Sequence, residues 1–201
     1  MPNPDLTVYT AHGAFWSAFG LTLLILRVLK RLGTATSEPV AASPHETTAP
    51  FSRGVLGIHV LAFIVMYIGM ASAVFPRRVP VWFSGQRVVG SMVIASGAVL
   101  VNWAMVYFRS WRFRAKLDEG HQLSTGGPFR LMRHPIYMGL NLLALGTAIM
   151  VPTTLVWAGF VLMGLGSDLR ARVEEPLLVQ AFGHAYRDYM ARTRRFIPGI
   201  Y

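Results

Sequence analysis

The chain of 201 residues contains no cysteine and only nine acidic residues. The absence of cysteine excludes disulfide bonds, thiolate nucleophiles and metal sites built from thiolates. Only 14% of the residues are charged, whereas an ordinary soluble domain has about 25%. The sequence also lacks an internal repeat and a polar segment long enough to form a soluble domain. These features predict one integral membrane domain.

Five apolar runs approach the roughly 20 residues that an α-helix needs to cross the hydrocarbon core of a bilayer. They are Ala14–Leu29, Val55–Phe75, Val88–Phe108, Ile136–Val151 and Thr153–Ser167. We expect the first to be a retained span rather than a signal peptide, because no basic residue precedes it. The predicted fold class is all-α integral membrane, with about five transmembrane helices, a short C-terminal helical hairpin and an amphipathic C-terminal helix.

Basic residues outnumber acidic ones, and the formal net charge is +10. If the N-terminus is outside, sixteen of the nineteen basic residues fall in cytosolic segments, and only Arg77, Arg78 and Arg87 fall outside. This asymmetry favours membrane topology and attraction to anionic lipid headgroups over nucleic-acid binding. We expect a multi-pass protein, in the inner membrane if the cell is bacterial.

The chain divides into two parts that differ in the kinds of segment they contain. Residues 1–120 comprise three spans and the linker Gly33–Ser52, which is rich in serine, threonine, alanine and proline. Residues 121–201 comprise a polar loop, the last two spans and a polar tail. Pro152 separates those two spans, so they form a tight hairpin whose cytosolic ends are neighbours.

The polar tail has the pattern of an amphipathic helix. From Pro176, a residue suited to the first turn of a helix, apolar residues recur at spacings of three and four. Gly183 interrupts the pattern and indicates a kink or a close approach. We expect this helix to lie on the membrane surface or to cover the polar loop.

The sequence RHPIY, residues 133–137, places charge directly against the fourth span. Pro135 suits the first helical position, and His134, Tyr137 and Asn141 would then share one face. Polar residues inside a membrane usually face a cavity or a bundle interior, so this line of residues predicts a site. Alternatively, the arginine reaches the headgroups, the histidine caps the helix and the tyrosine lies at the interface.

Glu174 and Glu175 stand at the other end of the hairpin. Arg170 lies four residues before Glu174, so the two could form a simple surface pair or part of a site. Because the hairpin is tight, His134 and Glu174 should converge in space. The six histidines include no His-x-x-x-His pair, and we predict no metal site.

Two stretches resemble a known family: HQLSTGGPFRLMRHPIYMG, beginning at His121, and EEPLLVQAFGHAYRDYMARTRRFIP, ending at Pro198. They contain an Arg-His-Pro-x-Tyr-x-Gly motif, a Glu-Glu pair and a Phe-Gly-x-x-Tyr-x-x-Tyr motif. In these features the chain resembles the isoprenylcysteine carboxyl methyltransferases, which are integral membrane enzymes, and more loosely the phospholipid N-methyltransferases. The resemblance implies an S-adenosylmethionine-dependent methyltransferase whose active site faces the cytosol.

The resemblance also assigns roles to individual residues. The implied cofactor pocket consists of His121, Gln122, Leu123, Ser124, Phe129, His134, Pro135, Ile136, Tyr137 and Glu174. Arg170 would face the lipophilic acceptor, and Arg133 would support the site. Phe129 stands where the family commonly has tyrosine, and Ser124 stands where an apolar residue is usual. A base such as Glu175 or His134 matters only for an amine or thiol acceptor, because a carboxylate has no proton to lose.

The sequence leaves three chemical classes of methyl acceptor open. A prenylcysteine-type carboxylate, a phospholipid amine and a small hydrophobic thiol are all lipophilic acceptors that would reach the site from the membrane. The competing class is a non-enzymatic protein that binds or carries lipids or small solutes. A transporter would more often have inverted repeats and broken helices in both halves, and the sequence has neither feature.

Overall fold

A computed structural model of the chain describes residues 6–31, 52–107 and 123–201. These residues form an all-α structure of six α-helices and one 3-10 helix, η2. The elements are α1 (Thr7–Arg31), α2 (Ser52–Val74), α3 (Gln86–Tyr107), η2 (Gly127–Arg130), α4 (Pro135–Met150), α5 (Thr154–Phe182) and α6 (His184–Arg192).

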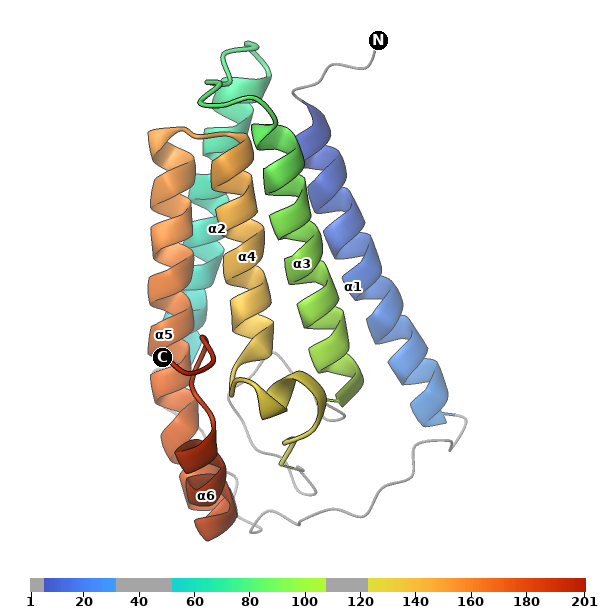
Figure 1. Cartoon of the computed structure of the whole chain (residues 1–201), viewed down its shortest axis with the longest axis vertical. Helices are drawn as coiled ribbons and strands as arrows, with labels where there is room; N and C mark the ends of the chain where they lie inside the picture. The colour runs from blue at the N-terminus through green and yellow to red at the C-terminus, as the bar shows by residue number, and fades with distance from the viewer. Residues whose placement is uncertain (1–5, 32–51, 108–122) are drawn as a thin grey trace.

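The first five α-helices run side by side as one bundle (Figure 1). α4 lies between α3 and α5, while α2 packs along α5 and α1 packs along α3. The start of α1, the connection from α2 to α3 and the turn from α4 to α5 lie at one end of the bundle. η2 and α6 lie at the opposite end, where the polar loop and tail meet.

Three helices in the described part of the chain are long and apolar enough to cross a membrane, and they are Thr7–Leu29, Gly54–Val74 and Gln86–Tyr107. α4 is also apolar but has only 16 residues. α5 has 29 residues, of which the first half is apolar and the second half carries charges. Each apolar run expected from the sequence lies within or almost within one of these helices.

α5 continues further than the sequence predicted. A separate helix beginning at Pro176 was expected, and this expectation was wrong, because Pro176 lies inside α5. Proline cannot donate a hydrogen bond to the carbonyl of Arg172 four residues earlier. Both residues are exposed, so water can bond that carbonyl instead. The break comes at Gly183, whose φ of 55° suits glycine, and α6 follows it.

A chain of hydrogen bonds fastens α1 to α2 and α4. Trp16 of α1 donates to the Tyr67 hydroxyl of α2 over 3.2 Å. His12 contacts the same hydroxyl through Nδ1 at 2.9 Å and Thr147 of α4 through Nε2 at 2.7 Å. Each of these polar groups inside the bundle is therefore satisfied by another helix, which a bilayer interior requires.

Glycines bring α3 and α4 into close contact. Gly97 of α3 faces Gly139 of α4, and Gly90 faces Gly146 one level further along. A Cβ atom on Gly139 would lie 2.8 Å from the Gly97 carbonyl oxygen. Small residues at such a contact let helix backbones approach and drive helix association in lipid. This contact fixes the position of α4, whose first turn carries the polar residues considered below.

We expect Gly139→Ala to lower the free energy of unfolding by about 1–3 kcal/mol, because the new methyl group has no room beside the α3 backbone. Gly164→Ala is the matched control, since a Cβ there would meet nothing within 4 Å. Thermal unfolding of the detergent-solubilised protein measures both. Equal melting temperatures for the two variants would contradict the close contact of α3 and α4.

Candidate active site

The turn between α4 and α5 is short, and it brings the start of α4 beside the second half of α5. Three residues, Val151 to Thr153, separate the two helices. Thr153 begins α5 by accepting a hydrogen bond from the Val156 amide. At the other end of the hairpin, Nδ1 of His134 lies 3.9 Å from Oε2 of Glu174. The convergence of these two residues, expected from the hairpin, is thus present in the structure.

Tyr137, Arg170 and Glu174 form one hydrogen-bonded group, which we call the Glu174 cluster. The Tyr137 hydroxyl donates to Oε1 of Glu174 over 2.5 Å. Nε of Arg170 donates to the Tyr137 hydroxyl over 2.6 Å and to the same Glu174 oxygen over 2.9 Å. Arg170 is buried, whereas the Glu174 side chain is 21% exposed. The carboxylate therefore stays accessible while the guanidinium is held in place.

Glu175 points to a second group of partners. Oε1 of Glu175 accepts from Nε of Arg133 at 2.8 Å and lies 3.3 Å from Nε2 of His134. Arg195 from the tail holds both carboxylate oxygens, through Nε at 3.1 Å and Nη2 at 2.7 Å. Burial alone would raise the pKa of Glu175, but hydrogen bonds from His134, Arg195 and Arg133 outweigh it and hold that pKa well below its usual range. Glu175 is therefore ionised near neutral pH and poorly suited to accept a proton.

Arg133 and His134 do not behave as simple interfacial residues. Besides its bond to Glu175, Arg133 donates through Nη1 to the backbone carbonyls of Thr193 and Met190. His134 occupies the N-cap position of α4, but its side chain makes no capping hydrogen bond. Its ring stacks on the Tyr137 ring with centroids 5.6 Å apart. Headgroup contact by Arg133 and helix capping by His134 are therefore not the roles that the structure supports.

A third polar group lies deeper in the bundle. Ser167 of α5 donates to Oδ1 of Asn141 over 3.4 Å and contacts Nε2 of His59 at 3.3 Å. The His59 ring of α2 lies 5.9 Å from the Tyr137 ring. Asn141 thus continues the line of His134 and Tyr137 along α4, and each of the three contacts α5. Sequence reasoning missed His59, although a histidine inside an apolar run was a signal for it.

The loop before α4 lies against the tail and the end of α3. Phe129 is buried in an apolar cluster with Phe182, Tyr186 and Tyr189, and its carbonyl accepts a hydrogen bond from the Tyr189 hydroxyl at 2.7 Å. Leu123 packs against the same cluster. These contacts hold η2 against α6. The tail therefore packs on the described part of the polar loop, which is one of the two positions expected for it.

Of the remaining predicted cofactor residues, those that the structure describes lie at the end of α3 and at the start of α4. The Ser124 hydroxyl donates to the Tyr107 carbonyl at the end of α3 over 3.0 Å. Pro135 is buried as the first residue of α4, and Ile136 packs between the two apolar clusters. His121 and Gln122 lie outside the described residues.

Sequence reasoning missed Arg195, which binds Glu175, and the two residues that hold Arg195, namely Asp168 and Tyr201. Arg195 donates through Nη1 to Asp168 at 3.2 Å and to the Tyr201 hydroxyl at 2.8 Å. The Tyr201 hydroxyl in turn donates to Asp168 over 2.6 Å. Asp168 offered the only available signal, because an acidic residue at the end of an apolar run needs a nearby cation.

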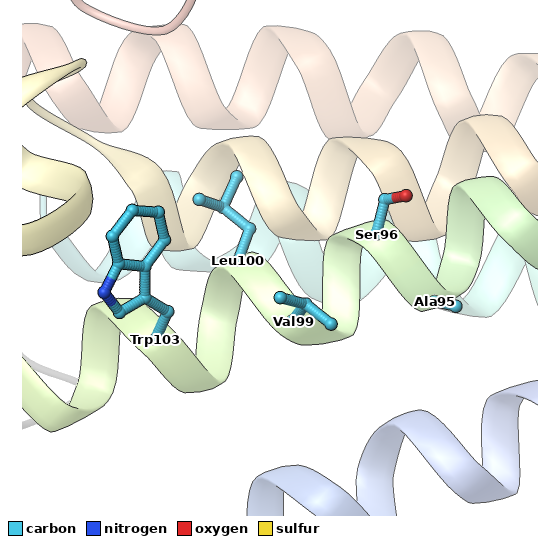
Figure 2. Close-up of a pocket in the computed structure, with 5 residues that line it drawn as sticks. All are labelled: Ala95, Ser96, Val99, Leu100 and Trp103. Carbon is cyan, nitrogen blue, oxygen red and sulfur yellow. The ribbon is translucent and has the colours of Figure 1, made fainter.

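A separate pocket of about 400 Å³ lies on α3 (Figure 2). Its lining is Ala95, Ser96, Val99, Leu100 and Trp103. This lining contains no charged side chain, and Val99 and Trp103 are exposed at the surface of the bundle. Its composition suits the apolar chain of a membrane lipid, and it lacks the charges that a polar cofactor would need.

Comparison with known proteins relates the chain to membrane methyltransferases. Residues 86–185 match the phospholipid methyltransferase family. A probable protein-S-isoprenylcysteine O-methyltransferase of Oryza sativa subsp. indica is 34% identical over 131 residues, which are 63% of this chain and 67% of the relative. Protein-S-isoprenylcysteine O-methyltransferase B of Arabidopsis thaliana is 31% identical over 116 residues, which are 55% of this chain and 58% of the relative.

A solved structure has a similar fold. It is the eukaryotic intramembrane Ras methyltransferase, an isoprenylcysteine carboxyl methyltransferase, and it aligns with a TM-score of 0.62 at 18% identity. The alignment covers 100% of this chain and 69% of the other. The sequence relatives and the shared fold confirm the resemblance found in the motifs. The chain belongs to the isoprenylcysteine carboxyl methyltransferase family of multi-pass membrane enzymes, which use S-adenosylmethionine as methyl donor.

Proposed function

We propose that the protein transfers a methyl group from S-adenosylmethionine to the carboxylate of a prenylcysteine-like acceptor at the cytosolic face of the membrane. The observation that carries this proposal is the Glu174 cluster. It combines an accessible carboxylate with a buried guanidinium at the polar end of an apolar helical bundle. The acceptors named for the relatives are isoprenylcysteines, which are lipophilic and anionic.

The residues around Glu174 suit the charges of the cofactor. When bound, S-adenosylmethionine supplies a methyl group on a sulfonium, together with an ammonium and a carboxylate. Oε1 of Glu174 is held by Tyr137 and Arg170, and Oε2 faces His134 at 3.9 Å. The exposed side of this carboxylate can pair the ammonium, while His134 or the amides of the 121–124 loop can answer the carboxylate. Phe129, Pro135 and Ile136 would then supply packing around the site.

Arg170 suits the acceptor. A guanidinium can hold a carboxylate bidentately, and its stem can lie along apolar surface. A lipophilic acceptor would come laterally from the bilayer, because leaving it would expose apolar surface at roughly 25 cal/mol per Å². The water-soluble cofactor would enter from the cytosol, past the polar loop and the tail. The two routes meet where His134, Tyr137 and Arg170 converge.

The low pKa of Glu175 favours a carboxylate acceptor. A phospholipid amine or a small thiol is the alternative, and the match to the phospholipid methyltransferase family favours the amine of these two. Such an acceptor must lose a proton, and Glu175 and His134 are the candidate bases for it. Glu175 is already bonded to three cationic or donor side chains, which lower its pKa. We therefore assign Glu175 to holding Arg133 and His134 in place.

We also propose a five-span topology with the N-terminus outside. The apolar part of α4, 16 residues or about 24 Å, spans less than the roughly 30 Å of the hydrocarbon core. Packing between longer helices compensates for that shortness. In this arrangement residues 1–120 supply three spans and 121–201 the cofactor site. This division concerns function and does not separate two structural domains, because α3 packs closely on α4.

Glu174→Ala should weaken binding of S-adenosylhomocysteine by about 10- to 150-fold, which corresponds to the roughly 1.5–3 kcal/mol of one charge-assisted hydrogen bond. Calorimetric titration of the purified protein measures the dissociation constant. Asp188→Ala on the exposed face of α6 is the control for a lost acidic charge. If Glu174→Ala binds as tightly as the parent protein, Glu174 does not contact the cofactor.

Arg170→Lys should lower acceptor turnover at least about tenfold, because lysine keeps the charge but loses the planar fork. Cofactor affinity should change little, since a cation remains beside Glu174. Labelled-methyl transfer to a panel of prenylcysteine, phospholipid and thiol acceptors measures turnover. Arg187→Lys, on the exposed face of α6, is the control.

If Arg170→Lys loses cofactor binding and turnover together, Arg170 contacts the cofactor and not the acceptor alone. Full activity would leave Arg170 as a structural partner of Glu174. Transfer to phospholipid amines alone would refute the prenylcysteine acceptor.

Single cysteines test the topology, because the chain has no native cysteine. Cysteines at Thr154 and at Ile200, both exposed, should react from opposite sides of the membrane. Cysteines at Ser43 and Asp118 should react from the same side as Ile200. Labelling with a membrane-impermeant thiol reagent before and after permeabilisation makes this distinction. Equal labelling of positions 154 and 200 from one side would refute five spans.

A further inference from the structure

The segment that follows α6, Thr193–Tyr201, folds back against the start of α4, and we call it the C-terminal clasp. In Figure 1 it lies beside the lower part of α5. Its backbone caps α4. The amide of Arg133 donates to the Arg194 carbonyl over 2.8 Å, and the amide of His134 donates to the Arg195 carbonyl over 3.1 Å. The start of a helix leaves amide donors without intrahelical partners, and the clasp supplies acceptors for two residues there.

This backbone contact explains why the His134 side chain makes no capping bond. An N-cap side chain ordinarily bonds the amides of the first turn. Here Pro135 has no amide hydrogen, and the clasp satisfies the amide of His134 itself. The imidazole can therefore turn toward the two glutamates.

Arg195 joins the clasp to α5 through its side chain. Its guanidinium holds both oxygens of Glu175 and also reaches Asp168 and the Tyr201 hydroxyl. The Arg195 side chain is 15% exposed, and that of Glu175 is 7% exposed. A bidentate pair that is shielded from water in this way is stronger and more directional than a surface ion pair.

Tyr201 closes the clasp on itself. Its carbonyl oxygen accepts from the amides of Phe196 at 2.7 Å and Ile197 at 2.6 Å. Its hydroxyl accepts from Arg172 at 3.0 Å as well as from Arg195, and it donates to Asp168. The position of the Arg195 guanidinium is thus fixed from both sides.

The same carboxylate oxygen links Arg195 to the site. Oε1 of Glu175 accepts from Arg195 and lies 3.3 Å from Nε2 of His134. A carboxylate can only accept, so a hydrogen bond here requires the proton on Nε2 of His134. That bond leaves Nδ1 directed toward Glu174. Arg195 therefore acts on His134 by two routes, through its own carbonyl and through Glu175.

We propose that Arg195 is a positioning residue for the cofactor pocket, and that the docked clasp orients His134 beside Glu174. This inference rests on the proposed assignment of His134 and Glu174 to the cofactor. It requires no contact between Arg195 and either substrate. It makes the last nine residues of the chain part of the apparatus that forms the binding site.

The test compares Arg195→Ala with Arg194→Ala. Arg194 is adjacent, carries the same charge and is exposed. Its side chain makes no hydrogen bond or ion pair with the residues that the structure describes, and alanine there keeps the backbone contact to Arg133. We expect Arg195→Ala to raise the dissociation constant of S-adenosylhomocysteine about tenfold, as displacement of a site residue can do. Arg194→Ala should bind like the parent protein. Calorimetric titration measures affinity, and thermal unfolding in detergent verifies that each variant is folded.

Two further variants separate positioning from general stability. Arg195→Lys should recover only part of the affinity, because one ammonium cannot hold both oxygens of Glu175. Glu175→Gln should weaken binding, and adding Arg195→Ala to it should cause little extra loss, because both changes break the same link. Fully additive losses would show that Arg195 does not act through Glu175.

Parent-like affinity in Arg195→Ala, or equal losses in Arg194→Ala and Arg195→Ala, would overturn the inference. If Arg195→Ala does not fold, Tyr201→Phe decides, since it removes one hydroxyl that holds Arg195. Weaker binding by folded Tyr201→Phe supports the proposal, and unchanged binding refutes it. A parent protein that fails to bind S-adenosylhomocysteine would refute the cofactor assignment itself, which distinguishes that failure from failure of the clasp alone.

Discussion

Two adjacent carboxylates, Glu175 buried and Glu174 partly exposed, are the constraint on which the site depends. Removing an ion from water costs several kcal/mol, so Glu174 and Glu175 can remain side by side only among cations. Arg170 accompanies Glu174, while Arg133 and Arg195 accompany Glu175. These arginines come from three places in the chain: the second half of α5, the start of α4 and the tail. Neutralising the two glutamates therefore holds three segments in one arrangement.

The two glutamates perform different tasks because they point in different directions. Adjacent residues on an α-helix are rotated by about 100°, so one carboxylate cannot share all the partners of the other. Glu175 is saturated by Arg133, His134 and Arg195, and these contacts keep its pKa low. Glu174 is partly exposed, and its Oε2 has only an imidazole nitrogen at 3.9 Å. The saturated carboxylate is suited to organising the site, and the accessible one is suited to binding a cationic ligand.

The sequence predicted those features that local rules determine. The hairpin followed from apolar length and Pro152, and it was sufficient to predict that His134 and Glu174 converge. Pro176 was misread, because a proline usually begins a helix and nothing local indicated that its neighbours would be exposed enough to tolerate it inside one. Arg195 was counted only as cytosolic charge. Its contact with Glu175 crosses 20 residues and depends on the turn at Gly183, which no spacing rule specifies.

The depth of the polar groups also limits where chemistry can occur. Full charges lie at the polar end of the bundle, around Glu175, where water can reach part of the network. The Glu174 cluster follows, in which Tyr137 shares hydrogen bonds with one ion pair. Deeper still, Asn141 and Ser167 offer neutral polar groups, and beyond them glycine contacts and apolar side chains fill the bundle. Transfer of a methyl group from a cationic donor to an anionic acceptor neutralises both groups. Such a transfer is favoured where the two ions are poorly solvated but still paired, because the products have less charge to stabilise. The middle level, at Tyr137 and Arg170, places an ion pair next to the apolar part of the bundle, so under the proposed function the reacting groups should meet there.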